Sequence, residues 1–370
     1  MSARMRELLG SWEGLGVFTY VDGPTGAWVF IAVHDDTLGM PLGGTRIYAY
    51  PTPEDGLKDA LRLAEAMTRK WAVVDVPFGG GKAVIALARP LSDEERPGLL
   101  ERYARTLNAL DGLFGTGEDL GSTTADMAFL RERSEWVFGV DPDTGEVTDP
   151  GPFTALGVLA GLRAALGHVF GDEGLCGRFV LVQGVGDVGA PLARMAAQAG
   201  AQVLVCDTDT ERAERLAVEL DGRVVSPDEV YDTPCDVYAP CAVAATLNEE
   251  SIPRLKCRIV AGSANAQLAV PADADRLRER GILYAPDYVV NAGGATAFGA
   301  LAEGVADEEE IRLRVLRLQE VLTEIFQEAA EREESPVHAA ERRATAILQR
   351  GPRATEAQRG GTPGTPSGSS

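Results

Sequence analysis

The sequence predicts an α/β protein with two domains. The chain has 370 residues, which is enough for two domains of ordinary size. Apolar strands alternate with amphipathic helices over residues 1–148, and over residues 149–350 the alternation is more regular and contains a strand, a glycine turn, a helix and a second strand in succession. The tail at 351–370 consists largely of Gly, Pro, Ser and Thr, so we expect it to be disordered.

The first domain is expected to begin with two strands around a turn and to continue with a helix, a strand and a second helix. The expected ranges are 28–36 and 41–50 for the strands, 53–74 for the helix, 82–87 for the third strand, and a helix capped by Ser92 that runs to about residue 110. Thr52 is placed to cap the first helix, Pro53 takes its first position, and Asp55 completes a capping box.

The second domain is expected to open with a helix and to continue with a set of short strands. The expected ranges are 152–166 for the helix, 178–183 for a strand, 191–200 for a helix, strands at 202–206, 235–240, 258–263 and 282–286, and a helical segment at about 306–350.

Composition and charge exclude several classes of partner. The net charge of −21 repels nucleic acid and anionic membranes, so neither is an expected partner. No run of 18 or more apolar residues is free of charges, and the N-terminus has no apolar core of signal-peptide length. Five cysteines form no C-x-x-C pair and lie in apolar contexts, so we expect buried, reduced thiols. These features indicate a soluble, cytoplasmic protein.

The segment VPFGGGKAVI, residues 76–85, places a lysine directly after three glycines. A phosphate-binding P-loop requires a Ser or Thr after its lysine to bind magnesium, and Ala83 stands there. The glycine run therefore needs another explanation than phosphate binding.

A second glycine motif has the complete context of a dinucleotide-binding fingerprint. Gly184, Gly186 and Gly189 follow the strand RFVLVQ and open a helix, and the next strand ends in Asp207. The glycines and the intervening Asp187 and Val188 are expected to bind a pyrophosphate at the helix N-terminus. Asp207 would accept hydrogen bonds from the ribose hydroxyls and repel a 2′-phosphate, which favours NAD over NADP. The alternative is a purely structural strand–helix turn.

The candidates for proton transfer are lysine and aspartate rather than histidine. His34, His168 and His338 each lie apart from any motif. Lys82 stands between the glycines and an apolar strand, so desolvation would lower its pKa and allow it to act as a general base. For Lys70 and Asp119, as for most charged residues, the alternative is a solvated surface position.

Seven motifs occur in order: PLGGTR, MTRKWAVVDVPFGGGKAVI, GEDLGSTTADM, VLVQGVGDVG, DVYAPCA, VAGSANAQL and YAPDYVVNAGG. Together they resemble the glutamate/leucine/phenylalanine/valine dehydrogenase superfamily over about residues 15–350, and the leucine, valine and phenylalanine branch most closely. The resemblance implies an active-site cleft between an N-terminal α/β substrate domain and a Rossmann-type NAD-binding domain, with C-terminal helices that pack back on the first domain. It also implies a homo-oligomer built through the first domain.

The resemblance implies NAD-dependent oxidative deamination of an L-amino acid to a 2-oxo acid and ammonia. By motif position, Lys70 matches the lysine that binds the substrate carboxylate, Lys82 the catalytic lysine, and Asp119 the catalytic aspartate. Further matches are Asn265, which orients substrate and nicotinamide, Gly43 and Gly44, whose backbone approaches the substrate, and Thr154, near the cofactor. On this interpretation the glycines before Lys82 leave room for the substrate α-carbon. The second residue of the family's Asn-Asn pair is Ala266 here.

The preferred amino acid stays open at this point. Glutamate dehydrogenases carry a lysine near the position of Leu42, so an apolar residue there favours an apolar substrate side chain. Gly117, Ala295 and Phe298 also match pocket positions, but one methylene changes discrimination by only about 1–3 kcal/mol, so leucine, valine, isoleucine and phenylalanine are all retained. The alternatives are a glutamate dehydrogenase and a catalytically silent NAD-binding homologue.

Overall fold

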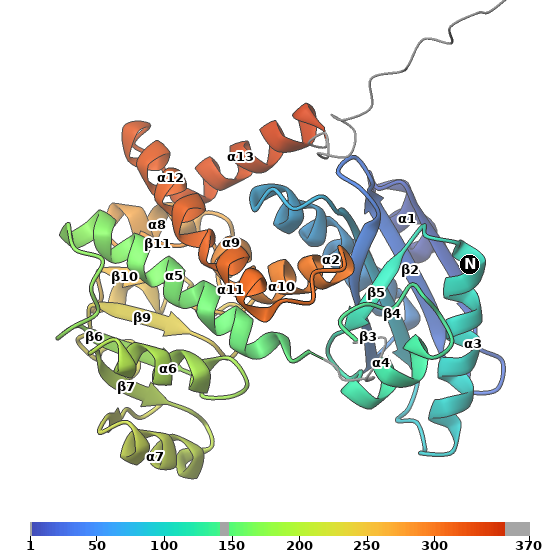
Figure 1. Ribbon diagram of the computed structural model, residues 1–370, viewed down its shortest axis with the longest axis horizontal. Helices are drawn as coiled ribbons and strands as arrows, with labels where there is room; N and C mark the ends of the chain where they lie inside the picture. The colour runs from blue at the N-terminus through green and yellow to red at the C-terminus, as the bar shows by residue number, and fades with distance from the viewer. Residues whose placement is uncertain (1, 141–147, 352–370) are drawn as a thin grey trace, which may run out of the picture.

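Two sheets organise the chain, one in each half of the sequence. The computed structural model describes residues 2–140 and 148–351; the expected disordered tail at 351–370 lies, apart from Gly351, outside the described residues. Figure 1 shows the two sheets in separate lobes, with α2 and α10 between them.

The first lobe contains the five-stranded sheet and four helices. Its elements are α1 (Ala3–Gly10), β1 (Gly16–Val21), β2 (Trp28–Asp35), β3 (Pro41–Ala49), α2 (Pro53–Val73), β4 (Gly79–Leu87), α3 (Glu95–Leu110), β5 (Gly115–Glu118) and α4 (Thr124–Arg131). The strand order is β1-β2-β4-β3-β5, in which β3 runs parallel to both β4 and β5 while β2 is antiparallel to β1 and β4. The expected strands at 28–36 and 41–50 are therefore not paired with each other, because β4 lies between them.

The second lobe contains a six-stranded sheet. Its elements are α5 (Pro150–Phe170), β6 (Phe179–Gln183), α6 (Gly189–Gln198), β7 (Gln202–Cys206), α7 (Thr210–Glu219), β8 (Arg223–Val224), β9 (Val237–Pro240), a 3₁₀ turn (Ile252–Arg254), β10 (Ile259–Val260), α8 (Asp273–Glu279), β11 (Leu283–Tyr284), α9 (Asp287–Val290), α10 (Gly293–Ala302), α11 (Glu308–Leu316), α12 (Leu318–Glu331) and α13 (Pro336–Arg350). All strands are parallel, in the order β11-β10-β9-β6-β7-β8. This doubly wound sheet confirms the expected α/β fold of Rossmann type.

Local sequence signals explain the helix boundaries. The Thr52 hydroxyl accepts a hydrogen bond from the Asp55 N–H at the start of α2, and the Ser92 hydroxyl does the same for the Glu95 N–H at the start of α3. The helical segment expected at 306–350 is divided into three helices. The last of them begins at Pro336, where the Ser335 hydroxyl accepts a hydrogen bond from the Val337 N–H.

Helix α5 is long and apolar enough to cross a membrane by length and composition alone. It lies instead inside the second lobe, where two-thirds of the apolar window is buried against neighbouring helices. The apolar run therefore serves as a core helix. The expectation for the cysteines is corrected in part: all five are free, but Cys176 is exposed, because it lies in a surface loop before β6.

Helix α2 connects the lobes. Its apolar face packs on β4 and β2, and its C-terminal end contacts α13, where the Arg343 Nε donates to the Val73 carbonyl at 2.9 Å. Near that end, Trp71 is fully buried, and its indole N–H donates to the Leu42 carbonyl on β3 at 3.0 Å. One side chain thus joins the helix to the central strands.

Trp71→Phe is expected to lower the free energy of unfolding by about 2–4 kcal/mol, because it opens a cavity and removes a buried hydrogen bond. Trp12→Phe is the matched control. Trp12 is half-buried and its indole N–H has no acceptor among the described residues, so a loss below about 1 kcal/mol is expected. Denaturant unfolding of both variants gives the comparison, and equal losses would contradict the role given to Trp71.

Candidate active site

A cavity of about 550 Å³ lies between the two lobes and receives residues from both. From the first lobe it is lined by Gly43, Gly44, Lys70, Lys82 and Asp119; from the second by Thr154, Asp187, Val188, Asn265, Ala295 and Phe298. Each of these residues was singled out from the sequence. Lys70 and Lys82 are the two cations among the lining residues.

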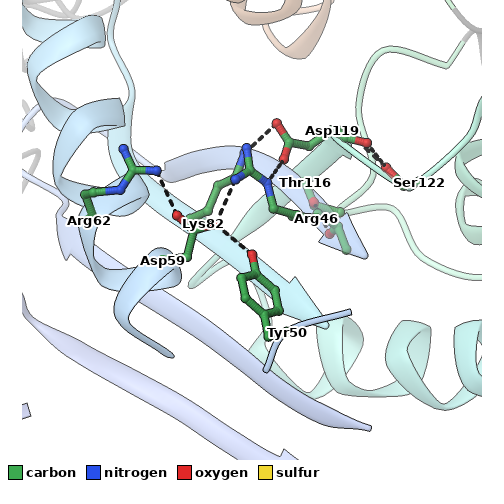
Figure 2. Close-up of polar contacts among 9 residues, drawn as sticks. Arg46, Tyr50, Asp59, Arg62, Lys82, Thr116, Asp119 and Ser122 are labelled. Carbon is green, nitrogen blue, oxygen red and sulfur yellow. Dashed lines mark hydrogen bonds and ion pairs between the residues drawn. The ribbon is translucent and has the colours of Figure 1, made fainter. Parts of the chain in front are cut away.

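Lys82 and Asp119 form an ion pair on the wall of this cavity (Figure 2). The Lys82 Nζ lies 2.9 Å from Asp119 Oδ1. Lys82 is only 5% exposed, because it lies in the middle of the buried apolar strand β4. Burial lowers the pKa of Lys82, and Asp119 opposes this shift. Burial alone would raise the pKa of Asp119, but the charges of Lys82 and Arg46 outweigh it and hold this pKa at about 2. Asp119 is therefore ionised near neutral pH.

The glycine run before Lys82 has a packing role, which corrects the expectation that it makes room for substrate. Gly79, Gly80 and Gly81 do not line the cavity. A Cβ on Gly80 would lie 1.9 Å from the Thr68 hydroxyl of α2, and a Cβ on Gly81 would lie 2.6 Å from the ring of Phe114. The glycines let β4 lie directly against α2 and Phe114, and this close packing fixes the position of Lys82 in the cavity wall.

On β3, Gly43 and Gly44 do line the cavity. A Cβ on Gly44 would lie 2.7 Å from the Asp119 Cβ, and one on Gly43 would lie 1.9 Å from the Gly81 carbonyl oxygen. These two positions cannot carry a side chain in this arrangement. Backbone therefore forms the cavity wall here.

Lys70 lies at the C-terminal end of α2 and is half-buried. Burial lowers its pKa to about 8, with the charge of Lys82 acting in the same direction and the carboxylates of Asp287 and Asp119 opposing. The pKa of Asp287 is itself raised by burial. Two lysines with lowered pKa values in one cavity form a positive centre that an anionic group would stabilise.

The apolar part of the cavity wall is formed by Met67, Phe138, Ala295, Phe298 and Leu301, the first four of which pack against one buried cluster. The rings of Phe138 and Phe298 meet edge to face with centroids 6.5 Å apart. A Cβ on Gly117 would lie 2.5 Å from the Phe298 ring, so the missing side chain at Gly117 makes room for this ring. Gly117 does not line the cavity itself.

The expectation for Leu42 is corrected as well. Leu42 does not line the cavity: it is fully buried in a cluster with Trp71 and Phe78, behind the apolar wall. Its side chain lies in this cluster, and the cavity wall at β3 is formed by Gly43 and Gly44 instead.

The glycine turn after β6 opens into the same cavity through Asp187 and Val188. Gly184 has φ +90, which favours glycine, and a Cβ on Gly189 would lie 1.8 Å from the Gly184 carbonyl oxygen. A Cβ on Gly186, by contrast, would enter open space, as expected where a ligand approaches the backbone. Asp207 follows β7 directly and lies beside this turn, and its Oδ2 accepts the Val185 N–H at 2.8 Å.

Asn291 is a site residue to which the sequence analysis gave no role, although it lies in the YAPDYVVNAGG motif. It lines the cavity and is only 5% exposed; its Nδ2 donates to Asn265 Oδ1 at 2.8 Å, and its Oδ1 has no partner among the described residues. Thr154 also lies on the cavity wall and donates to the Pro150 carbonyl. Like Asn291, Arg46 lies in a motif, PLGGTR, but was given no role by the sequence analysis. It forms an ion pair with Asp119 and does not line the cavity.

Comparison with known proteins agrees with this architecture. Residues 25–136 match the Glu/Leu/Phe/Val dehydrogenase dimerisation domain, and residues 207–358 match the Glutamate/Leucine/Phenylalanine/Valine dehydrogenase domain. The leucine dehydrogenase of Geobacillus stearothermophilus is 42% identical over 74% of each chain, and the phenylalanine dehydrogenase of Lysinibacillus sphaericus 38% identical over 84% of this chain and 82% of its own. The crystal structure of L-tryptophan dehydrogenase from Nostoc punctiforme superposes with a TM-score of 0.79 at 35% identity, covering 94% of this chain and 98% of its own. The chain belongs to the Glu/Leu/Phe/Val dehydrogenase family of amino acid dehydrogenases.

Proposed function

We propose that the protein catalyses the reversible NAD-dependent oxidative deamination of an apolar L-amino acid to its 2-oxo acid and ammonia. One observation carries the proposal. A single cavity combines a buried Lys82–Asp119 pair, a second lysine, an apolar end and the mouth of a glycine turn. A catalytically silent homologue would have no need to keep a lysine buried beside an aspartate on the cavity wall.

The residues around the glycine turn fit a dinucleotide. The open space at Gly186 lies at the N-terminus of α6, a ten-residue helix whose backbone N–H groups and dipole favour a pyrophosphate. Asp207 lies at the end of the next strand, where it can accept hydrogen bonds from ribose hydroxyls in addition to the Val185 N–H. Bound NAD would supply the acceptor for the hydride that leaves the substrate α-carbon.

The charged residues divide the remaining work. Lys70 binds the substrate carboxylate, which would stabilise its protonated form against the burial that lowers its pKa. Lys82 takes a proton from the water that attacks the α-carbon and stabilises the oxygen anion as it develops. Asp119, ionised at the outset, accepts protons from the substrate nitrogen and returns them to the departing ammonia. Asn291 and Asn265 present amide groups to the same cavity.

The substrate side chain is assigned to the apolar end. In this proposal both lysines act at the α-carbon end of the substrate. A glutamate side chain in the apolar end would therefore place its carboxylate among Met67, Phe138 and Phe298 without a lysine beside it. Burial of such an unpaired charge is costly. This argument disfavours glutamate dehydrogenase, and it rests on the cavity wall rather than on Leu42.

A homo-oligomer formed through the first lobe is part of the proposal. The matched family domain is described as a dimerisation domain. The strand β1 lies at the edge of its sheet and carries Phe18 and Val21 at 45% and 46% exposure. An exposed apolar edge strand is an unusual surface for a monomer, and pairing with a second copy would cover it.

Lys82→Ala is expected to lower turnover by about 10²–10⁴-fold, the range for loss of a general acid or base, while NAD still binds. The control is Lys58→Ala, which removes an exposed lysine from α2. Steady-state NADH absorbance and NAD titration by fluorescence give the two quantities. Near-normal turnover of Lys82→Ala would remove the basis of the proposed function.

The wild type is expected to use NAD with a higher kcat/KM than NADP, and Asp207→Ala to narrow this preference. Because the Val185 N–H also loses its charged acceptor, affinity for NAD should fall by about 10- to 100-fold. Asp209→Ala is the control: that carboxylate caps α7 and should leave the cofactor ratio unchanged. Equal use of both cofactors by the wild type would contradict the assignment of Asp207.

Leucine, valine, isoleucine or phenylalanine is expected to be oxidised much faster than glutamate. Phe298→Ala should shift the preference toward larger side chains, because it opens the apolar end without adding a polar group. Gly117→Ala should reduce activity in the wild type, where the new methyl group meets the Phe298 ring, and should be tolerated in the Phe298→Ala background. Rates over a panel of amino acids test all three statements. Glutamate as the best substrate, or an unchanged size preference in Phe298→Ala, would refute this pocket.

A further inference from the structure

The Asp119 carboxylate is held by two cations on two sides. Its Oδ1 lies 2.9 Å from Lys82 Nζ on β4, and its Oδ2 accepts a hydrogen bond from Arg46 Nε on β3 at 2.8 Å. Lys82 lines the cavity and Arg46 does not. Figure 2 shows the Arg46 side chain between Asp119 and Asp59. Arg46 thus contacts Asp119 without forming part of the cavity wall.

Arg46 is itself fixed by Asp59, a residue of α2. Its NH1 donates to Asp59 Oδ2 at 2.7 Å, and the same oxygen accepts the Tyr50 hydroxyl at 2.6 Å. The other oxygen, Oδ1, accepts Arg62 NH2 at 2.7 Å. Asp59 and Arg46 are mostly buried, with side chains 16% and 19% exposed, whereas Arg62 is 55% exposed. The charges thus alternate from the cavity to the surface, and Arg46 is the link between the two carboxylates.

We propose that Arg46, held by Asp59, is a positioning residue for the reaction: it fixes the Asp119 carboxylate beside Lys82 and keeps it ionised. This inference rests on the proposed function, because it gives Arg46 a role only through Asp119. A planar guanidinium suits the task, since Nε and NH1 point to different acceptors and can bridge two carboxylates at once. An ammonium at this position could reach one of them but would not hold the angle between them.

The backbone around Asp119 limits what else could orient this side chain. The Asp119 N–H donates to the Ser122 hydroxyl at 2.9 Å, and that hydroxyl donates to the Asp119 carbonyl at 2.8 Å. These bonds fix the loop after β5 but leave the carboxylate free to rotate. Among the described residues, only Lys82 and Arg46 contact the carboxylate oxygens of Asp119, so these two side chains set its direction.

The charge of Arg46 acts on both members of the catalytic pair in the same direction. It lowers the pKa of Asp119, together with Lys82, and it lowers the pKa of Lys82. The other charges that act on the pair are Asp59, which opposes the shift at Lys82, and Lys70, whose ammonium interacts with both residues. Asp287 faces Lys70 from α9. Loss of the positive charge at Arg46 should thus move the pKa values of Lys82 and Asp119 upward together.

The decisive measurement is the pH profile of kcat/KM for amino acid oxidation. Arg46→Gln is expected to lower kcat by about 10- to 100-fold through misplacement of Asp119, and to move the limbs of the profile to higher pH by about one unit. Arg46→Lys keeps the charge but cannot bridge both acids, so it should lower kcat without moving the limbs. Arg69→Gln should behave as the wild type, because Arg69 is an exposed arginine of α2 that pairs with Glu65.

A purely structural link between β3 and α2 would give a different result. Arg46→Gln would then have a lower melting temperature and a lower kcat, but the limbs of its kcat/KM profile would stay at the pH of the wild type. This outcome overturns the inference. A kcat and a pH profile equal to those of the wild type overturn it as well. If Arg46→Gln does not fold, as judged by circular dichroism, Arg46→Lys and Asp59→Asn decide: wild-type kcat in both overturns the proposal, and a reduced kcat in both supports it. Lys82→Ala distinguishes a failure of this inference from a failure of the proposed function. If Lys82→Ala is inactive while Arg46→Gln has the activity and pH profile of the wild type, only the role of Arg46 is refuted.

Discussion

The buried Lys82–Asp119 pair is the interaction on which the rest of the site depends. An ammonium that is 5% exposed in an apolar strand is costly unless a carboxylate meets it, and here the partner comes from the loop after another strand. The two residues therefore require that β4, β3 and β5 lie in the observed order. The three glycines before Lys82 satisfy this requirement by letting β4 lie against α2 and Phe114 without side chains between them.

This constraint extends from the pair to the whole first lobe. Trp71 joins α2 to β3, and Asp59 and Arg46 join the same two elements nearer to the N-terminus of the helix. Helix α2 also carries Lys70 and Met67, so a single element places a cation and part of the apolar wall relative to the Lys82–Asp119 pair. At its far end the helix contacts α13, which links these positions to the second lobe. The positions of Lys70 and Met67 in the cavity wall are thus set largely by one helix.

Much of this arrangement could be predicted from the sequence, because its signals are local or sequential. Caps and apolar periodicity predicted α2 and α3, and the spacing of Gly184, Gly186, Gly189 and Asp207 predicted the unit β6-α6-β7. What the sequence did not show are contacts that depend on strand order. Leu42 lies in a cluster with Trp71 and Phe78, and the glycine run packs against α2 and Phe114; both are contacts between elements far apart in the sequence. Arg46 and Asn291 stood in quoted motifs, but only the fold brings them to Asp119 and Asn265.

Ala266 shows how backbone conformation can outweigh the identity of a side chain. The residue has φ +50, a left-handed conformation that costs an alanine about 1–2 kcal/mol and that asparagine and glycine adopt more readily. The loop tolerates this because its neighbours are held on several sides. Asp287 accepts the Gln267 N–H, the Gln267 side chain donates to the Gly262 and Ala264 carbonyls, and the Ala266 carbonyl accepts the Ala245 N–H. The Ala266 side chain is exposed and is not among those that line the cavity, whereas Asn265 is held toward the cavity by Asn291. The alanine at this position therefore bears on the strain of this loop more than on the groups presented to the cavity.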